Sequence, residues 1–150
     1  MKIISHRGNI RGRVPSRENA PSYIDCAIGN GYDVEVDVGE YNGELWLGHD
    51  KPQYKITWNW IFHRQKNLWV HCKNVEAAKT CHIFQAFCHT NDPYTYTSND
   101  KIWLHDLERK FDQTTIIPLL DWELVDSFKT HIKNEVPYGI CTDYPYMLND

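Results

Sequence analysis

The chain has 150 residues, a length that fits one domain, which we take to span residues 1–150. With 41% hydrophobic and 13% aromatic residues it can build a packed core, so the composition argues against a disordered chain. The formal net charge of -4 gives no general attraction to nucleic acid, and we expect no nucleic-acid partner.

The hydrophobic pattern predicts strands and helices that alternate over much of the chain. In the first half the predicted elements are a strand at 3–5, a helix at 21–28, a strand at 32–38, an extended piece at 44–48, a helix at 57–64 with Thr57 as its N-cap, and a strand at 67–73. In the second half they are a helix at 74–81 capped by Asn74, an extended segment at 83–88, a hairpin or two closely linked strands at 94–98 and 101–105, a strand at 115–119, a helix from Asp121 to about Ile132, and a last strand at 138–142.

Alternation of this kind is typical of βαβ units and a largely parallel sheet. A (β/α)8 barrel normally takes at least ~200 residues, so a chain of 150 must have lost helices to form one. Strand signals crowd together between Ile83 and Leu119, where we place that loss. We therefore predict an α/β fold, a compact, degraded (β/α)8 TIM-like barrel with several helices shortened or missing. An open doubly wound sheet is the alternative.

Reactive side chains gather where the predicted strands end, the rim at which parallel α/β folds build their active sites. They are His6 and Arg7, Glu35 and Asp37, His49 and Asp50, His71 and Lys73, and Asp143. Residues two apart in a strand point the same way, so Glu35 and Asp37 share one face. Two neighbouring carboxylates repel each other unless a cation lies between them, and oxygen ligands suit Mg²⁺ or Ca²⁺. The alternative is that they form the solvated face of an outer strand.

A pair of histidines could carry the chemistry. His6 and His49 each follow an extended segment and stand beside a charged residue, and imidazoles can act as general acid and base near pH 7. Arg7 offers a fork of donors that matches phosphate oxygens, and Lys73 adds a second positive charge. Structural salt bridges are the alternative role for both cations.

The cysteines and further histidines suggest a competing zinc site. Five cysteines are an odd number without a C-x-x-C pair, which indicates reduced thiols and a cytoplasmic location. The N-terminus lacks the apolar stretch of a signal peptide, and no window approaches the ~18 apolar residues of a membrane span. The candidate zinc ligands are His71, Cys72, Cys81, His82, Cys88 and His89. Their spacing does not match that of a structural zinc site, and buried thiols on strands are simpler core residues.

At these residues the sequence resembles the glycerophosphodiester phosphodiesterase family, within the wider group of phospholipase-C-like phosphodiesterase barrels. The resemblance rests on Ser5-His6-Arg7-Gly8, Arg17-Glu18-Asn19-Ala20, the strand from Tyr32 to Val38, Leu47-Gly48-His49-Asp50 and the segment from Tyr138 to Pro145. Order and spacing agree over residues 3–50, and the likeness is thin from 51 to 137.

The resemblance implies two catalytic histidines, His6 and His49, and a divalent metal (Mg²⁺, Mn²⁺ or Ca²⁺) on Glu35 and Asp37. It also implies a phosphate contact by Arg7, with Glu18 supporting the site. From their places beside His49 and at the end of the last strand, we expect Asp50 and Asp143 to support the site as well. On the third strand His71 stands where the family has a third carboxylate ligand, and Lys73 stands at the family lysine. We include His71 among the metal ligands.

The predicted function is therefore a metal-dependent phosphodiesterase that hydrolyses small glycerophosphodiester-like substrates by two-histidine acid–base catalysis. One alternative is a related enzyme that cleaves phospholipid head groups, which needs an apolar rim facing the membrane. Its nearest candidates are Trp58, Trp60, Ile61 and Phe62. The other alternative is a non-catalytic relative that binds phosphate and metal without turnover.

Overall fold

The computed structural model describes residues 1–131 and 136–149. Its strands are β1 (Lys2–His6), β2 (Asp33–Tyr41), β3 (Glu44–Leu47), β4 (Tyr54–Ile56), β5 (Leu68–Cys72), β6 (Ala86–Phe87), β7 (Tyr94–Tyr96), β8 (Ile102–Leu104), β9 (Thr115–Pro118) and β10 (Gly139–Thr142). Its helices are α1 (Pro21–Gly29), α2 (Trp58–Arg64), α3 (Val75–Cys81), α4 (Trp122–His131) and the short 3-10 helix η1 (Pro145–Leu148).

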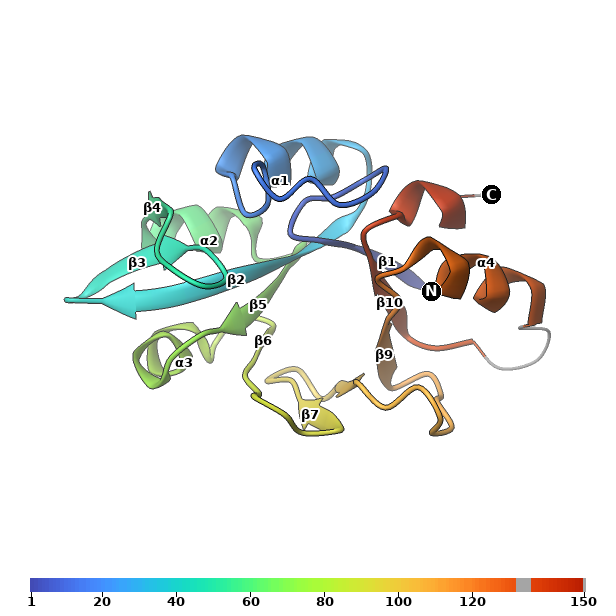
Figure 1. The fold of residues 1–150 in the computed structure, drawn as a ribbon. Coiled ribbons are helices and arrows are strands. Elements are labelled where there is room, and N and C mark those ends of the chain that lie inside the picture. The colour runs from blue at the N-terminus through green and yellow to red at the C-terminus, as the bar shows by residue number, and fades with distance from the viewer. Residues whose placement is uncertain (132–135, 150) are drawn as a thin grey trace.

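The ten strands form one curled, mixed sheet (Figure 1). One path through it runs β4-β3-β2-β1-β10-β9-β8-β7, and β5 pairs with the other edge of β2 and with β6. Pairings of β1 with β2 and β10, of β2 with β5, of β5 with β6 and of β9 with β8 and β10 are parallel. The β2–β3, β3–β4 and β7–β8 pairings are antiparallel.

The predicted (β/α)8 barrel is wrong. The sheet is a curled half-barrel of mixed strand direction, and only four α-helices occur in the described residues, too few to follow every strand. None of them lies between Cys81 and Trp122 in the described chain, and β7 and β8 form a hairpin there instead of a βαβ unit. Helices were expected to be lost in this region. The reason the barrel class fails is that antiparallel hairpins replace the crossover connections of that fold.

Most individual elements agree with the sequence pattern. The side chains of Thr57 and Asn74 cap α2 and α3, each accepting a hydrogen bond from a backbone N–H in the first turn. The β7–β8 hairpin is confirmed, but the extended segment at 83–88 is reduced to the two residues of β6. The strand β4 was not predicted. Ile132, expected near the end of α4, lies outside the described residues.

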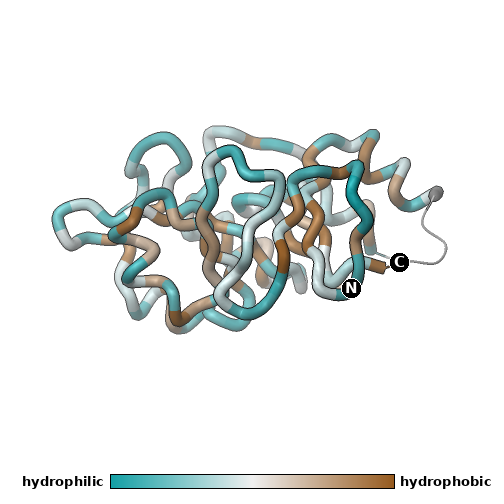
Figure 2. Tube along the Cα trace, turned by 90° about the horizontal axis from the view of Figure 1, so that it is seen from below, coloured by the Kyte–Doolittle hydropathy of each residue, from teal (hydrophilic) through white to brown (hydrophobic). Residues whose placement is uncertain are grey.

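The core explains why the sheet curls. One buried cluster, which we call the interior cluster, joins side chains of β1, β5, β6, β8, β9 and β10; its members are Ile4, Trp69, Phe87, Trp103, Ile116 and Cys141. Strands that face one shared cluster must bend around it, and burial of that apolar surface stabilises the bend. Figure 2 shows hydrophobic stretches along the central strands and hydrophilic residues at many outer turns.

A second, larger cluster lies on the other side of β2 and β5, beneath α1, α2 and α3, and includes Val34, Val36 and Val38. The valine face of β2 is thus covered by helices, while its acidic face looks into the curl, so both faces are buried. The solvated outer strand considered for Glu35 and Asp37 is therefore excluded. No helix in the described part of the chain has the length and apolar character needed to cross a membrane.

Candidate functional site

His6 lies at the end of β1, and the turn that follows it depends on glycine. Gly8 has φ +90°, and a Cβ there would lie 2.9 Å from the ring of Tyr23, so other residues would be strained and crowded. His6 Nδ1 lies 2.8 Å from Asp143 Oδ1, across the β1–β10 pair, and its Nε2 lies 3.9 Å from Glu35 Oε2. Because the Asp143 carboxylate can only accept a hydrogen bond, the neutral imidazole carries its proton on Nδ1, and Nε2 faces Glu35.

The pKa of His6 is raised above its ordinary value. Burial lowers the pKa of this imidazole, but the hydrogen bond to Asp143 and the negative charge of Glu35 raise it by more. His6 therefore holds its proton to a higher pH than a free histidine does.

His49 follows β3 after a second required glycine. Gly48 has φ +148°, and a Cβ there would lie 2.1 Å from the carbonyl oxygen of Lys51. His49 Nδ1 lies 2.6 Å from Asp50 Oδ1, so a carboxylate again stands behind Nδ1 and leaves Nε2 free. Its side chain is 41% exposed, whereas that of His6 is 12% exposed, so the two imidazoles share one arrangement in different environments.

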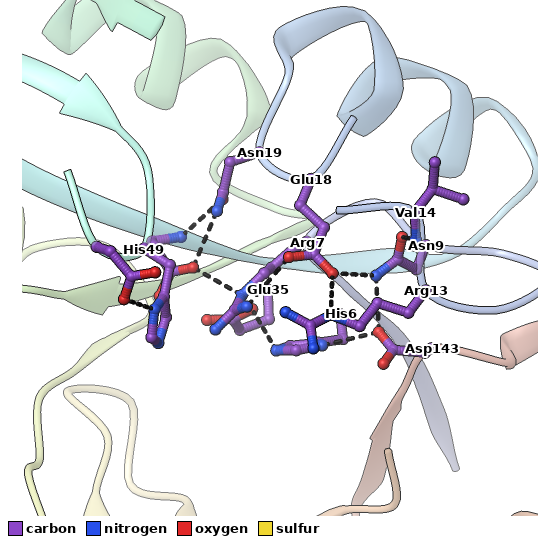
Figure 3. Close-up of polar contacts among 12 residues, drawn as sticks. His6, Arg7, Asn9, Arg13, Val14, Glu18, Asn19, Glu35, His49 and Asp143 are labelled. Atoms are coloured by element: carbon purple, nitrogen blue, oxygen red, sulfur yellow. Dashed lines mark hydrogen bonds and ion pairs between the residues drawn. The ribbon is translucent and has the colours of Figure 1, made fainter. Parts of the chain in front are cut away.

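A buried polar network connects the loop after β1 to Asp143 (Figure 3). Arg7 Nη1 donates to Glu18 at 3.2 Å, and Asn9 Nδ2 donates to Glu18 at 3.2 Å and to Asp143 at 2.8 Å. Arg13 Nε also donates to Glu18, at 3.0 Å. Glu18 thus accepts hydrogen bonds from three residues of this loop, and its role in the site stays a prediction. Asn9 was missed because a single asparagine in a polar loop carries no signal of its own.

Asp37 is fully buried and has several partners. Asn19 holds it on two sides, donating to Oδ2 at 2.9 Å and accepting from the Asp37 backbone N–H at 3.0 Å. Arg7 Nε lies 2.8 Å from Oδ2, and Lys73 Nζ lies 3.6 Å from Oδ1. Burial raises the pKa of Asp37, but His71 and the positive charge of Arg7 outweigh it and hold the pKa well below its usual range.

Arg7 is therefore not a free fork for a phosphate. Two of its nitrogens face Asp37 and Glu18, and its backbone has a φ of 55°, an uncommon conformation for a residue other than glycine. This backbone is held by hydrogen bonds to the Glu35 carbonyl and from the Asn19 N–H. Strain of this kind, kept by surrounding contacts, is common at functional sites.

The three predicted metal ligands come together. Glu35, Asp37 and His71 each offer one ligand atom, and these atoms all lie within 4.8 Å of one another; this is the one such group found in the described residues. His71 Nδ1 lies 3.2 Å from Asp37 Oδ1 and 3.6 Å from Glu35 Oε1. Ligand atoms around a cation with bonds of ~2.1 Å lie roughly 3.0–3.4 Å apart, so the His71–Asp37 distance suits a divalent ion and the His71–Glu35 distance is slightly longer.

The hydrogen bonding of these residues fits a metal as well. Asp37 Oδ1 and Glu35 Oε2 are buried, yet neither accepts a hydrogen bond of good geometry from any described residue. The nearest donors to these oxygens are His71 and Lys73 for Asp37 and His6 for Glu35, and a cation at this place would satisfy both carboxylates more fully. Arg7 and Lys73 already neutralise part of the charge, so we expect modest rather than tight binding.

A cavity of about 200 Å³ opens at this rim. Its lining includes five residues of the predicted site or its surroundings, His6, Arg7, Glu35, His49 and His71. In Figure 3, Glu35 and Arg7 lie between His49 on the left and His6 on the right.

The other predicted residues lie around this cavity. Glu18 and Asp50 line an adjoining polar cavity, together with Arg7 and His49. Lys73 lines a third cavity beside α3, and its closest described charge is Asp37, so the structure brings it to the metal ligands and not to the cavity of His6.

The sequence interpretation missed the far wall of the cavity, formed by Phe87, His89, Trp103, His105, Pro118, Leu120 and Cys141. A signal for part of it was present in the sequence. The pattern aromatic-x-His occurs as Trp69-Val70-His71, Phe87-Cys88-His89 and Trp103-Leu104-His105. In a strand this spacing places each aromatic ring and its histidine on one face.

The zinc alternative has no support in the described chain. Cys72 and Cys81 belong to the helix-covered core, and Cys88 is exposed. His71 turns away from these thiols to Asp37, and all five cysteines are free.

No protein-family model, curated protein or solved structure matches this chain. The fold and site together define a curled α/β sheet with a candidate metal centre and two carboxylate-oriented histidines at its carboxyl rim.

Proposed function

We propose that this chain is a metal-dependent phosphodiesterase acting on small glycerophosphodiester-like substrates. One observation carries the proposal: two histidines, each with a carboxylate behind Nδ1, line one cavity with members of the candidate metal centre. Hydrolysis of a diester needs a base for the attacking oxygen, an acid for the leaving oxygen and positive charge at the phosphate. Each requirement has a residue at this rim.

The environments of the two histidines divide their roles. His6 has a raised pKa and is buried between Asp143 and Glu35, so it is the general acid that holds a proton for the leaving group. His49 is more exposed and has a free Nε2, so it is the general base. His49 takes the proton of water or of a substrate hydroxyl as that oxygen bonds to phosphorus. His6 then protonates the leaving alcohol as its P–O bond breaks.

Glu35, Asp37 and His71 would hold the divalent ion, which when bound supplies Lewis-acid stabilisation of the phosphate oxygens. Arg7 orients Asp37 through its Nε and faces the cavity, so it places positive charge near the phosphate without acting as a free bidentate clamp. Lys73 balances the charge of Asp37 from the side.

The size of the cavity supports a small substrate. At about 200 Å³ it is below the ~300–1,000 Å³ typical of sites for drug-sized ligands. The family resemblance of residues 3–50 favours a glycerophosphodiester. Five free cysteines fit the reducing conditions of the cytoplasm, where we place the protein.

The test is hydrolysis of bis(4-nitrophenyl) phosphate and of glycerophosphodiesters with Mg²⁺, Mn²⁺ or Ca²⁺, before and after EDTA. We expect turnover that EDTA abolishes and an added divalent ion restores. His6→Ala and His49→Ala should each lower kcat by ~10²–10⁴-fold. His63→Ala, on the exposed part of α2, is the matched control and should leave kcat unchanged.

The outcome separates an enzyme from a non-catalytic relative. Metal binding to Glu35, Asp37 and His71 without turnover on any diester would make the chain a phosphate- and metal-binding protein. Turnover that survives both His6→Ala and His49→Ala would place the chemistry elsewhere.

A lysophospholipid-type substrate is the second candidate, and a specific observation favours it. Leu120 lines the cavity and is 37% exposed, and Trp122 close by at the start of α4 is 52% exposed. An exposed apolar edge at a cavity mouth can receive an acyl chain. The residues considered from the sequence do not line this cavity: Ile61 is buried in the core, and Trp58 stacks on Phe62 along α2. Activity on lysophospholipids that Trp122→Ser lowers selectively would support this candidate.

A further inference from the structure

The repeated aromatic-x-His pattern builds two rows of rings inside the curl. One row is the aromatic rings of the interior cluster, in which Phe87 stacks on Trp103 with 4.3 Å between the ring centroids. The other row, which we call the imidazole row, consists of three histidines at or just after the ends of β5, β6 and β8: His71, His89 and His105. His71 and His89 stack at 4.9 Å and 2°, and His89 and His105 lie 3.9 Å apart at 39°. The row thus leads from the candidate metal centre to the far wall of the cavity.

One ring nitrogen of His89 and one of His105 have no assigned partner. His89 Nδ1 and His105 Nε2 are buried without a hydrogen bond to any described residue, and both side chains line the cavity of His6. Buried polar nitrogens are normally satisfied, so an unpartnered one in a cavity wall indicates a ligand or water that it contacts. His89 Nδ1 and His105 Nε2 therefore each indicate a ligand or water in this part of the cavity.

The geometry of the row argues against a second metal ion. A metal must lie close to the plane of each imidazole that binds it, whereas the rings of His71 and His89 are parallel and stacked. At the far end of the row, burial and then the charges of His89 and His71 lower the pKa of His105 to about 4. A neutral imidazole donates one hydrogen bond and accepts another, as an alcohol hydroxyl does.

We propose that His89 and His105 are specificity-determining residues that bind the uncharged, hydroxyl-bearing alcohol of the diester above the Phe87–Trp103 pair. This inference rests on the proposed function and adds the substrate subsite. The phosphate lies toward Glu35 and His6, the hydroxyls of the alcohol contact the two free imidazole nitrogens, and its carbon skeleton packs on the aromatic floor. The lining residues Phe87, His89, Trp103 and His105 include no carboxylate, lysine or arginine, which disfavours a charged alcohol.

Kinetics on two substrates test the subsite. Against a glycerophosphodiester, His105→Phe and His89→Phe should each raise KM by about 3- to 10-fold, the loss of one hydrogen bond, with kcat within about twofold. Against bis(4-nitrophenyl) phosphate, which has no hydroxyl group, the same variants should leave KM unchanged. Phenylalanine keeps a stacking ring, and His105→Gln, which restores a donor and an acceptor, should recover part of the KM. His82→Phe, on an exposed histidine after α3, is the control. Equal changes on both substrates, or none on either, would overturn the proposal.

A binding experiment keeps the subsite testable if the wild-type protein hydrolyses no diester. Histidine ring ¹⁵N resonances are recorded by NMR with glycerol 3-phosphate and with inorganic phosphate. Shifts of the His89 and His105 resonances with glycerol 3-phosphate, larger than with inorganic phosphate, support the alcohol subsite even where the enzymatic proposal has failed. Equal shifts with both would identify an anion site, and no shift with either would show that the row contacts no ligand; both results overturn the inference.

Discussion

The two sides of the cavity are built by different means. The side formed by residues 1–50 is charged, and ion pairs and amide hydrogen bonds hold its buried groups, as Asn19 and Arg7 hold Asp37. The side formed by β6, β8 and the residues that follow them is neutral, and stacked rings hold it. The first side rests on the nine-residue strand β2, whereas β6 and β8 have two and three residues.

This difference matches the parts of a phosphodiester. A charged group needs fixed counter-charges that burial strengthens, because an unpaired buried charge is very costly. An uncharged alcohol needs only a few hydrogen bonds and apolar contact, which the His89 and His105 imidazoles and the Phe87–Trp103 pair provide. The comparison predicts that substitutions on the charged side cost both folding and activity, while those on the neutral side change selectivity.

The largest effect is expected at Asp37, which carries most of the charge contacts. Asp37→Asn keeps the shape but leaves Arg7 and Lys73 beside a neutral group, and removing one partner of a buried pair costs about 3–5 kcal/mol. We expect that loss in urea denaturation, together with loss of metal binding by calorimetry. Asp25→Asn, which breaks the more exposed pair with Arg64, is the control and should cost under about 1 kcal/mol. Equal losses in the two variants would contradict the role given to Asp37.

The charged side was predictable from the sequence because buried charges leave local signals. Glu35 and Asp37 on a strictly alternating strand predicted the acidic face, and His71 two residues before Lys73 joined the same group. The neutral side was missed because its rings lie on three short strands far apart in the sequence, where each His alone looks ordinary. The barrel prediction failed for a related reason: strand signals do not state which strands pair across the sheet, so the hairpin expected at 94–105 was still placed in a closed parallel barrel.

A smaller effect is expected when lysine replaces Arg7, which keeps the positive charge but removes the planar guanidinium. A lysine ammonium cannot face Asp37 and Glu18 in the geometry of the guanidinium, so Arg7→Lys should lower kcat/KM by roughly tenfold, the worth of one charge-assisted hydrogen bond. Arg13→Lys is the matched control because Arg13 also pairs with Glu18 but is 61% exposed. Wild-type activity in Arg7→Lys would show that the bridge between the two carboxylates is dispensable.

The metal preference of the protein tests whether His71, which lies between the charged and neutral sides of the cavity, is a metal ligand. A nitrogen ligand favours Mn²⁺ or another transition ion over Ca²⁺, and it removes one negative charge relative to a third carboxylate. His71→Glu should therefore shift the preference toward Mg²⁺ or Ca²⁺, by roughly tenfold in relative affinity. Competition against Mn²⁺, followed by electron paramagnetic resonance, measures this, with His82→Glu as a control of equal charge. An unchanged order of preference would leave His71 outside the metal's coordination.

The smallest expected effect is on the pH dependence of folding stability. A histidine on the charged side and one on the neutral side should contribute with opposite signs. The pKa of His105 is about 4 in the folded protein against an ordinary value of 6.5, so below pH 6.5 the unfolded chain binds a proton that the folded protein does not. The His105 imidazole therefore makes the folded protein less stable as the pH falls from 6.5 to about 4. His6 has a raised pKa, so its contribution is fully present below pH 6.5 and is lost as the pH rises through the folded value.

The measurement is the free energy of unfolding in urea at pH 7.5, 6 and 4.5, with EDTA present so that no bound cation alters the charges. His105→Phe should become more stable relative to wild type as the pH falls, by about 1 kcal/mol, because the imidazole is only partly buried and solvent screens its neighbours. His6→Asn should become less stable relative to wild type over the same range, because it lacks the imidazolium held by Asp143. Slopes of the same sign in the two variants would mean that the charged and neutral sides do not differ in the way their histidines titrate.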